Sequence, residues 1–228
     1  PEEVILMPLY PQYSAATSGS SIKEWKDVCK KNNYKVKTST ICCYPTDQNF
    51  INAHTKEIIK KIKDLKNFKL IFSAHGLPEK NIKKGDPYQW QVEQSVKKIV
   101  ENLNIKNLDW ILSYQSRVGP LKWIGPSTED IIVVNSKLGK HIVLVPIAFV
   151  SEHSETLVEL DIEYKEIADA NGCKNYTRVP ALGINDGFIK AISELIIKKN
   201  EYKISDNLYP PKVQCPSNFK KCPCLNYE

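Results

Sequence analysis

The first candidate for chemistry in this sequence is a histidine at the end of an apolar run. His75 follows residues 69–74, and a glycine and a proline constrain the loop that it opens. A neutral imidazole accepts protons near pH 7, so His75 is a candidate proton acceptor; the alternative is a structural hydrogen-bonding group. His54 and His141 are weaker candidates, because His54 lies in a lysine-rich helix and His141 begins a strand.

The second candidate is a row of carboxylates after the apolar run 142–148. Spacings of three, four and four residues place four glutamates within an arc of roughly 80° on a helix. Like charges in such a row repel one another, and the single cation in this stretch, Lys165, lies off the row. A row of this kind suits a divalent cation or a proton path, whereas a solvated helix face is the alternative. It consists of Glu152, Glu155, Glu159 and Glu163.

His153 complicates the geometry of this helix. In a regular helix it would lie about 160° from Glu155, so the two could not face one site. They can do so only if residues 151–154 precede the helix or if its first turn is distorted, for example by a π-bulge. We predict one of these two departures.

The elements that position these residues alternate between strands and helices, which is typical of parallel βαβ units in an α/β fold. In such a sheet ligands bind beyond the carboxyl ends of the strands, where His75 and Glu155 both fall. No glycine-rich phosphate loop follows any strand, so we expect no nucleotide site. Ser127 is a predicted N-cap, with Asp130 in the first turn. The sequence predicts strands over 4–9, 34–42, 69–74, 109–113, 142–148 and, more weakly, 176–178, and helices over 20–32, 48–65, 87–102, 127–137, 154–170 and 186–199.

The pattern divides the chain into three segments. Residues 1–66 supply two strands and two helices and are interpreted as the end of one domain. Residues 67–200 hold a nearly complete set of alternating units and are expected to form a second, similar domain. Residues 201–228 contain four prolines and three cysteines and are expected to form an irregular tail. The opening residues look like neither a signal peptide nor a transit peptide, and we expect a fragment or a processed product.

Composition excludes several classes of protein. With 228 residues, of which 42% are hydrophobic, the chain can bury a core, and its apolar runs are too short to span a bilayer. The net charge of +6 comes almost entirely from lysine, since Arg117 and Arg178 are the only arginines. We therefore expect no nucleic acid partner, although weak attraction to an anionic membrane surface is compatible with this charge. Seven cysteines, an odd number in a long chain, favour reduced thiols in an intracellular compartment.

Several short segments resemble the ferrochelatase family, whose members insert ferrous iron into protoporphyrin IX to make haem. Each segment is short, but their order and spacing together are highly specific. The resemblance extends from near residue 1 to about residue 200 and corresponds to the carboxyl-terminal portion of the family. The matching segments are 9–14 (LYPQYS), 73–78 (SAHGLP), 85–88 (GDPY), 115–120 (QSRVGP), 123–126 (WIGP) and 146–164.

The resemblance implies roles for most of these residues. His75 matches the family's active-site histidine, and Glu155 matches the essential glutamate that faces it across the porphyrin. The aromatic residues that line the porphyrin cleft are matched by Tyr10, Trp123 and Phe149. The residues expected to contact the metal are His75, Glu152, His153, Glu155, Glu159 and Glu163, the last two on a helix that is π-distorted in the family.

The family's activity gives the expected function of this chain. We expect a lyase that uses Fe²⁺ and protoporphyrin IX as substrates and requires no cofactor. The alternative is a non-catalytic tetrapyrrole-binding or haem-handling module, since the amino-terminal part of the family's cleft is absent from this chain. A homodimer and a peripheral membrane contact are compatible with the resemblance. The expected location is intracellular: the matrix side of the mitochondrial inner membrane in a eukaryote, or otherwise a plastid or the cytoplasm.

Two local departures from the family pattern also bear on the function. Gly76 stands where many members have serine. Animal members bind a [2Fe–2S] cluster with one cysteine in the turn after the first strand and three near the carboxyl terminus, but the turn position here is Ala15. The tail cysteines also differ from the animal spacing, so we expect no cluster and tail thiols that are reduced or bind metal loosely. A cluster would need a fourth ligand, and the candidates are Cys29, Cys42, Cys43 or another group; the tail thiols are Cys215, Cys222 and Cys224.

Overall fold

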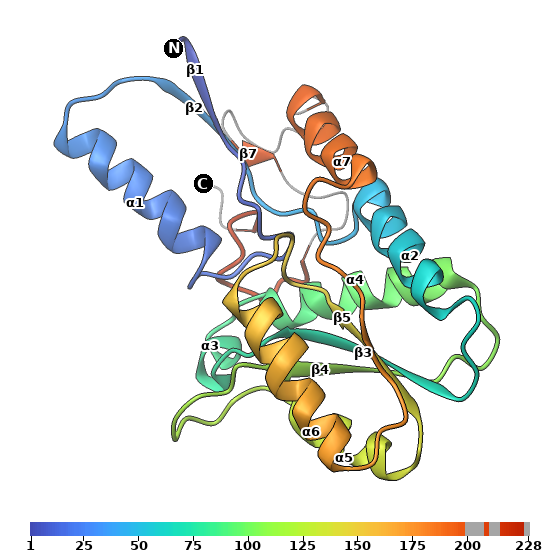
Figure 1. Cartoon of the computed structure of the whole chain (residues 1–228). Helices are drawn as coiled ribbons and strands as arrows, with labels where there is room; N and C mark the ends of the chain where they lie inside the picture. Colours follow the sequence, from blue (N-terminus) through green and yellow to red (C-terminus); the bar gives the residue numbers. More distant parts are fainter. Residues whose placement is uncertain (199–207, 210–214, 226–228) are drawn as a thin grey trace.

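Two parallel β-sheets organise the chain, and the computed structural model describes residues 1–198, 208–209 and 215–225 (Figure 1). The first sheet has the order β1-β2-β7 and contains β1 (Glu3–Leu6), β2 (Lys37–Ile41) and β7 (Leu208–Tyr209). The second has the order β4-β3-β5-β6 and contains β3 (Phe68–His75), β4 (Trp110–Gln115), β5 (His141–Pro146) and β6 (Tyr176–Arg178). Every strand pair is parallel, which confirms the predicted α/β architecture.

Helices cover both faces of the second sheet, as a parallel sheet requires. Alternate residues of β3 separate the two cores: Leu70 and Phe72 pack with α4 (Tyr88–Leu103), whereas Ile71 packs with Ile132 of α5 (Thr128–Lys137). Figure 1 shows α5 and α6 on one side of the sheet and α4 on the other, with α2 and α7 side by side. The remaining helices are α1 (Ser18–Lys31), α2 (Gln48–Ile62), α3 (Glu79–Lys83), the π-helix η1 (Glu155–Glu163), α6 (Tyr164–Ala170) and α7 (Asp186–Ile197).

The strand register brings the predicted site together. His75 is the last residue of β3 rather than the first residue of a loop, and it pairs with Gln115 at the end of β4. The loop after β5 leaves the sheet at the same edge and leads to η1. Ser127 accepts a hydrogen bond from the Asp130 N–H, which confirms the predicted N-cap of α5.

The tail departs from the expected irregular arm. Its two-residue strand β7 pairs with Thr40 and Ile41 of β2, so the chain returns to the first sheet. A strand of two residues is too short to show the alternation of apolar and polar residues from which strands are predicted. Its partner strand also lies more than 160 residues away along the chain. Phe50 and Ile58 of α2 also join the core of the second sheet, and the predicted boundaries near residues 66 and 200 stay predictions. No helix within the described residues is long and apolar enough to cross a membrane.

The buried His54 of α2 predicts a pH-dependent stability. Within the described part of the chain neither of its ring nitrogens has a hydrogen-bond partner, and burial lowers the pKa of His54 to about 3. Between that value and the ordinary value of 6.5 the unfolded chain binds a proton that the folded chain does not. His54 therefore does not alter the free energy of unfolding above pH 6.5. Below pH 6.5 the free energy of unfolding decreases, and the loss from pH 7 to pH 5 is about 2 kcal/mol. Denaturant unfolding at both pH values should show this loss in the wild type and a smaller one in His54→Leu; equal losses would contradict it.

Candidate active site

A histidine and a glutamate from two different elements form the centre of the candidate site. The Nε2 atom of His75, at the end of β3, lies 3.3 Å from Oε1 of Glu155, the first residue of η1. Both side chains are 38% exposed, so they are accessible from solvent yet held by the fold. The Nδ1 atom of His75 lies 2.7 Å from the carbonyl oxygen of Gly76. Because a carbonyl oxygen only accepts, Nδ1 carries the hydrogen, and Nε2 of the neutral ring faces Glu155 with its lone pair.

This arrangement sets a lone pair against a carboxylate. Two acceptors at 3.3 Å attract each other only when a cation lies between them, either a proton on one of them or a metal ion. A proton or a metal ion between the two groups would therefore stabilise the His75–Glu155 pair.

Aromatic and imidazole rings surround the pair. The ring of Phe149 lies edge-on to His75 at 6.3 Å between centroids and to His153 at 4.6 Å. The backbone N–H of Glu155 donates to Nδ1 of His153 at 3.2 Å, so the second histidine is fixed at the start of η1. Phe149 thus makes an edge-type ring contact with each of the two imidazoles.

The glutamate helix is distorted as predicted. Residues 151–153 precede it, Ser154 is its N-cap, and residues 155–163 form a π-helix. Of the two departures proposed for placing His153 and Glu155 at one site, the π distortion is present, while Ser154 has helical dihedral angles and only residues 151–153 precede the helix. Such π-helical segments are rare and occur frequently at functional sites.

Glu159, one helical turn further on, is held by an extensive set of hydrogen bonds. Its carboxylate accepts from the Ser116 N–H at 2.8 Å, the Ser116 hydroxyl at 2.6 Å, the Gln115 amide at 3.0 Å and the Tyr164 hydroxyl at 2.9 Å. Ser116 adopts a φ of 56°, a left-handed conformation that costs energy for a non-glycine residue. The strained turn after β4 thus aims two donors at Glu159 and fixes the position of η1 against the sheet.

Glu152 is engaged away from the His75–Glu155 pair. Its carboxylate accepts from Nη1 of Arg178 at 2.9 Å and from the Ala181 N–H at 3.0 Å. Burial opposes ionisation, yet hydrogen bonds from Thr156, Arg178 and Ala181 together lower the pKa of Glu152. Arg178 also makes a bidentate ion pair with Asp161 of η1, with hydrogen bonds of 2.6 and 2.7 Å. It therefore links Glu152, in the loop before η1, to the helix.

Most of the predicted site residues line one of two cavities, whereas His75 and Glu152 are among the lining residues of neither. One of about 520 Å³ is lined by Tyr10, Phe149, His153 and Glu155, together with Leu9 and residues of the loop after β5. The other, of about 420 Å³, is lined by Trp123, Glu159 and Glu163, together with Arg117 and Tyr164. Both volumes are in the range of small-molecule sites. The carboxylate row therefore divides: Glu155 faces the first cavity, and Glu159 and Glu163 face the second.

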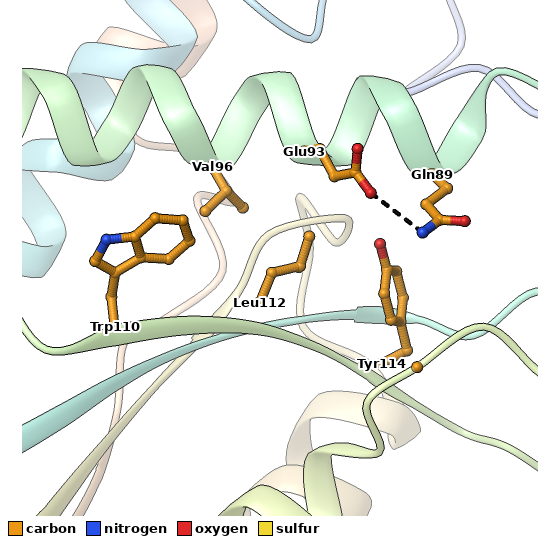
Figure 2. Close-up of a pocket in the computed structure, with 7 residues that line it drawn as sticks. Gln89, Glu93, Val96, Trp110, Leu112 and Tyr114 are labelled. Atoms are coloured by element: carbon orange, nitrogen blue, oxygen red, sulfur yellow. Dashed lines mark hydrogen bonds between the residues drawn. The ribbon is translucent and has the colours of Figure 1, made fainter.

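A smaller cavity of about 260 Å³ lies between α4 and β4 (Figure 2). Figure 2 shows the Tyr114 hydroxyl pointing toward Gln89 and Glu93, while Val96, Trp110 and Leu112 close the apolar end. Burial raises the pKa of Glu93. None of the predicted site residues lines this cavity.

Sequence reasoning missed the residues that hold the site in place. Gln115 and Ser116 were noted only as a matching segment, and Arg178 only as one of two arginines. The structure explains why glycine occupies position 76, because a Cβ atom there would lie 2.9 Å from the Gln115 carbonyl oxygen. The signal that could have found Gln115 and Ser116 is their place at the carboxyl end of β4, beside His75.

The fold and its relatives now define the class of protein. The structure is similar to that of SirB from Bacillus subtilis with Fe³⁺, with a TM-score of 0.64 at 12% identity over 86% of this chain and 71% of that one. This likeness confirms the chelatase-type fold. The ferrochelatase family model matches residues 1–200, so the chain belongs to the ferrochelatase family.

Several bacterial proteins are among its curated relatives. A ferrochelatase of Pelagibacter ubique (strain HTCC1062) is 94% identical over 228 residues, which is 100% of this chain and 66% of that protein. Ferrochelatases of Rickettsia bellii (strain OSU 85-389) and Rickettsia felis (strain ATCC VR-1525 / URRWXCal2) are 51% and 50% identical and are covered to 63% and 65%. The chain thus spans somewhat less than two thirds of the length of these relatives. The mitochondrial and plastid locations expected from the resemblance have no support from these bacterial proteins.

Proposed function

We propose that the complete protein inserts Fe²⁺ into protoporphyrin IX to form protohaem. The observation that carries the proposal is the His75–Glu155 pair, an imidazole and a carboxylate 3.3 Å apart, of which Glu155 lines a cavity of about 520 Å³. Membership of the ferrochelatase family supports the choice of substrates. Bacterial ferrochelatases are among the family proteins that match the chain, so we place the reaction inside a bacterial cell.

Porphyrin metallation requires the loss of two pyrrole protons and the transfer of a metal ion from water to the ring nitrogens. In our proposal Nε2 of His75 accepts a proton. The other ring nitrogen, Nδ1, bonds the Gly76 carbonyl, so the lone pair of Nε2 is free to accept. Glu155 then stabilises the imidazolium that forms. Both groups come from the chain, so the step as proposed uses no cofactor.

The aromatic residues act on the shape of the porphyrin. Tyr10 is 47% exposed and lines the same cavity as Phe149, so its ring is free to contact a flat ligand. A flat porphyrin hides its nitrogen lone pairs in the ring plane. A wall that favours a puckered ring lowers the barrier to metallation, because it binds the transition state better than the substrate. Trp123 lines the second cavity, so it contacts the porphyrin only if the bound porphyrin extends into that cavity.

The metal ligands proposed from the sequence differ in their freedom to bind iron. Among them His153 and Glu155 line the first cavity, His75 lies 3.3 Å from Glu155, and Glu163 lines the second cavity. The carboxylates of Glu159 and Glu152 already accept hydrogen bonds from the protein, so we assign these residues positioning roles rather than direct contact with the metal. Imidazole and carboxylate hold ferrous iron less tightly than thiolates do, which lets the ion leave for the ring.

The alternative is a tetrapyrrole-binding module without catalysis, and its basis is the length of the chain relative to its relatives. Mixing protoporphyrin and Zn²⁺ with the complete gene product and with residues 1–228 alone distinguishes the two. Zinc-porphyrin fluorescence that grows with the complete protein supports the proposal. Porphyrin binding by both proteins without metal insertion supports the alternative, and no porphyrin binding by either would overturn both.

A further inference from the structure

The cavity of about 260 Å³ between α4 and β4 takes no part in the proposed function, because none of the predicted site residues lines it (Figure 2). Alternate residues of β4 point to one face of the sheet, and residues three or four apart on α4 lie on one face of the helix. These two faces form the main walls of the cavity, so regular secondary structure shapes it. The wall residues are Trp110, Leu112 and Tyr114 of β4 and Gln89, Glu93 and Val96 of α4.

The hydroxyl of Tyr114 lies at one end of this cavity without a hydrogen-bond partner. Tyr114 is 2% exposed, and within the described part of the chain no group bonds its hydroxyl oxygen. Burial and the neighbouring Glu93 carboxylate raise the pKa of Tyr114, so the hydroxyl keeps its proton. A buried hydroxyl without a partner is unfavourable, and a molecule that enters the cavity can supply the missing partner.

Glu93 brings a negative charge to the same end of the cavity. Figure 2 shows the Tyr114 hydroxyl pointing toward the side chains of Gln89 and Glu93, and the Gln89 amide donates to the Glu93 carboxylate at 3.1 Å. Burial raises the pKa of Glu93 and this hydrogen bond lowers it, and no cation among the described residues forms an ion pair with the carboxylate. A carboxylate without a cationic partner, beside a protonated phenol, favours a cationic hydrogen-bond donor as the ligand.

A primary ammonium group matches the oxygen atoms at this end. It has three N–H donors and no acceptor. The acceptors available to it are a carboxylate oxygen of Glu93, the hydroxyl oxygen of Tyr114 and the side-chain oxygen of Gln89, whose nitrogen already bonds Glu93. An anionic ligand would be repelled by Glu93, and a quaternary ammonium group has no hydrogen to donate, so neither fits this end as well.

The other end of the cavity suits a small aromatic ring. Val96 and Leu112 close it together with Trp110, as Figure 2 shows. The Trp110 indole packs edge-to-face with Phe72 at 6.2 Å between centroids and is still 39% exposed, so part of its surface is available to a ligand. At about 30 Å³ for each water, the volume of about 260 Å³ corresponds to roughly nine waters, or to a ligand of about nine non-hydrogen atoms.

We propose that the cavity between α4 and β4 binds a small primary amine that carries an aromatic ring. The ammonium group bonds Glu93, Gln89 and Tyr114, and the ring lies at the Trp110 end. Glu93 is exposed and Gln89 is partly exposed, so rotation of these two side chains admits the ammonium group to the buried hydroxyl. The bond between Gln89 and Glu93 is at the surface, where it is readily exchanged for a bond to the ligand. The proposal rests on this cavity alone and is independent of iron insertion.

The test is calorimetric titration of the complete gene product with phenethylamine, a primary amine of the expected size. We expect saturable binding at one site per chain, with a dissociation constant of about 1 mM or below. The uncharged 2-phenylethanol, which has the same shape, should bind about tenfold more weakly or worse, and the anion phenylacetate should not bind. Equal binding of the amine and the alcohol, or no saturable binding of the amine, would overturn the proposal and leave the Tyr114 hydroxyl to water.

Three variants locate the binding site. Glu93→Gln should weaken phenethylamine binding about tenfold or more, because it removes the charge that pairs with the ammonium group. Tyr114→Phe removes only a hydroxyl without a partner, so it should fold like the wild type and bind the amine about fivefold more weakly. The matched control is Glu101→Gln on the same helix, since Glu101 pairs with Lys98 at 2.9 Å and does not line the cavity. Thermal unfolding checks the fold of each variant, and equal binding by Glu93→Gln, Tyr114→Phe and Glu101→Gln would overturn the assignment of the site.

Discussion

Replacing His75 with alanine in the complete protein should abolish metal insertion while leaving porphyrin affinity within a few-fold of the wild type. The substitution removes Nε2, which lies 3.3 Å from Glu155, and with it the proposed proton acceptor. Loss of a positioned general base costs about 10²–10⁴-fold in turnover. The aromatic wall formed by Tyr10 and Phe149 is untouched, so porphyrin binding should persist. Stopped-flow or steady-state metallation and fluorescence titration with protoporphyrin measure the two effects separately.

A matched control is available on the same sheet. His141 begins β5, at the opposite edge from His75, and bonds the Thr177 hydroxyl at 2.9 Å. His141→Ala should therefore change stability but not the rate constant of metallation. Partial recovery of His75→Ala by added imidazole would support a chemical role, whereas near-normal turnover of His75→Ala would refute the assignment of the base.

The scaffold of this site could be predicted from local sequence patterns. Strands and helices alternate, and the carboxyl ends of parallel strands share one edge, so His75 and Glu155 were expected close together. The distortion of η1 also followed from geometry, since His153 and Glu155 cannot share a face in a regular helix. These inferences depend on the spacing of apolar and charged residues over short stretches of the chain, which can be read from the sequence alone.

The partners of individual side chains could not be predicted in the same way. The carboxylate row had four equivalent members in the sequence, but Arg178, 26 residues away, engages Glu152, and the strained turn at Ser116 engages Glu159. Such pairings depend on the exact packing of strands and loops that are distant along the chain. The packing of Cys42 against cysteines of the tail segment 215–225 has the same origin, because β7 and this segment leave no local pattern.

Replacing Glu155 with glutamine should lower the rate of metallation about 10²-fold or more while preserving the fold. Glutamine keeps the size of the side chain but removes the negative charge opposite Nε2 of His75. Its amide group can instead donate a hydrogen bond to that nitrogen, which occupies the lone pair that accepts the proton. Both effects act on the proton-transfer step, so turnover should fall much more than porphyrin affinity.

The informative comparison for Glu155→Gln is the same change at Glu166, an exposed glutamate of α6 that touches neither cavity. Glu166→Gln should leave the turnover rate unchanged and the free energy of unfolding within about 0.5 kcal/mol of the wild type, since isolated surface substitutions have small effects. If the two variants lose turnover equally, or if Glu155→Gln alters only the midpoint of thermal unfolding, then Glu155 belongs to a solvated helix face. If only Glu155→Gln loses turnover, the carboxylate acts with His75 in moving the protons that iron displaces.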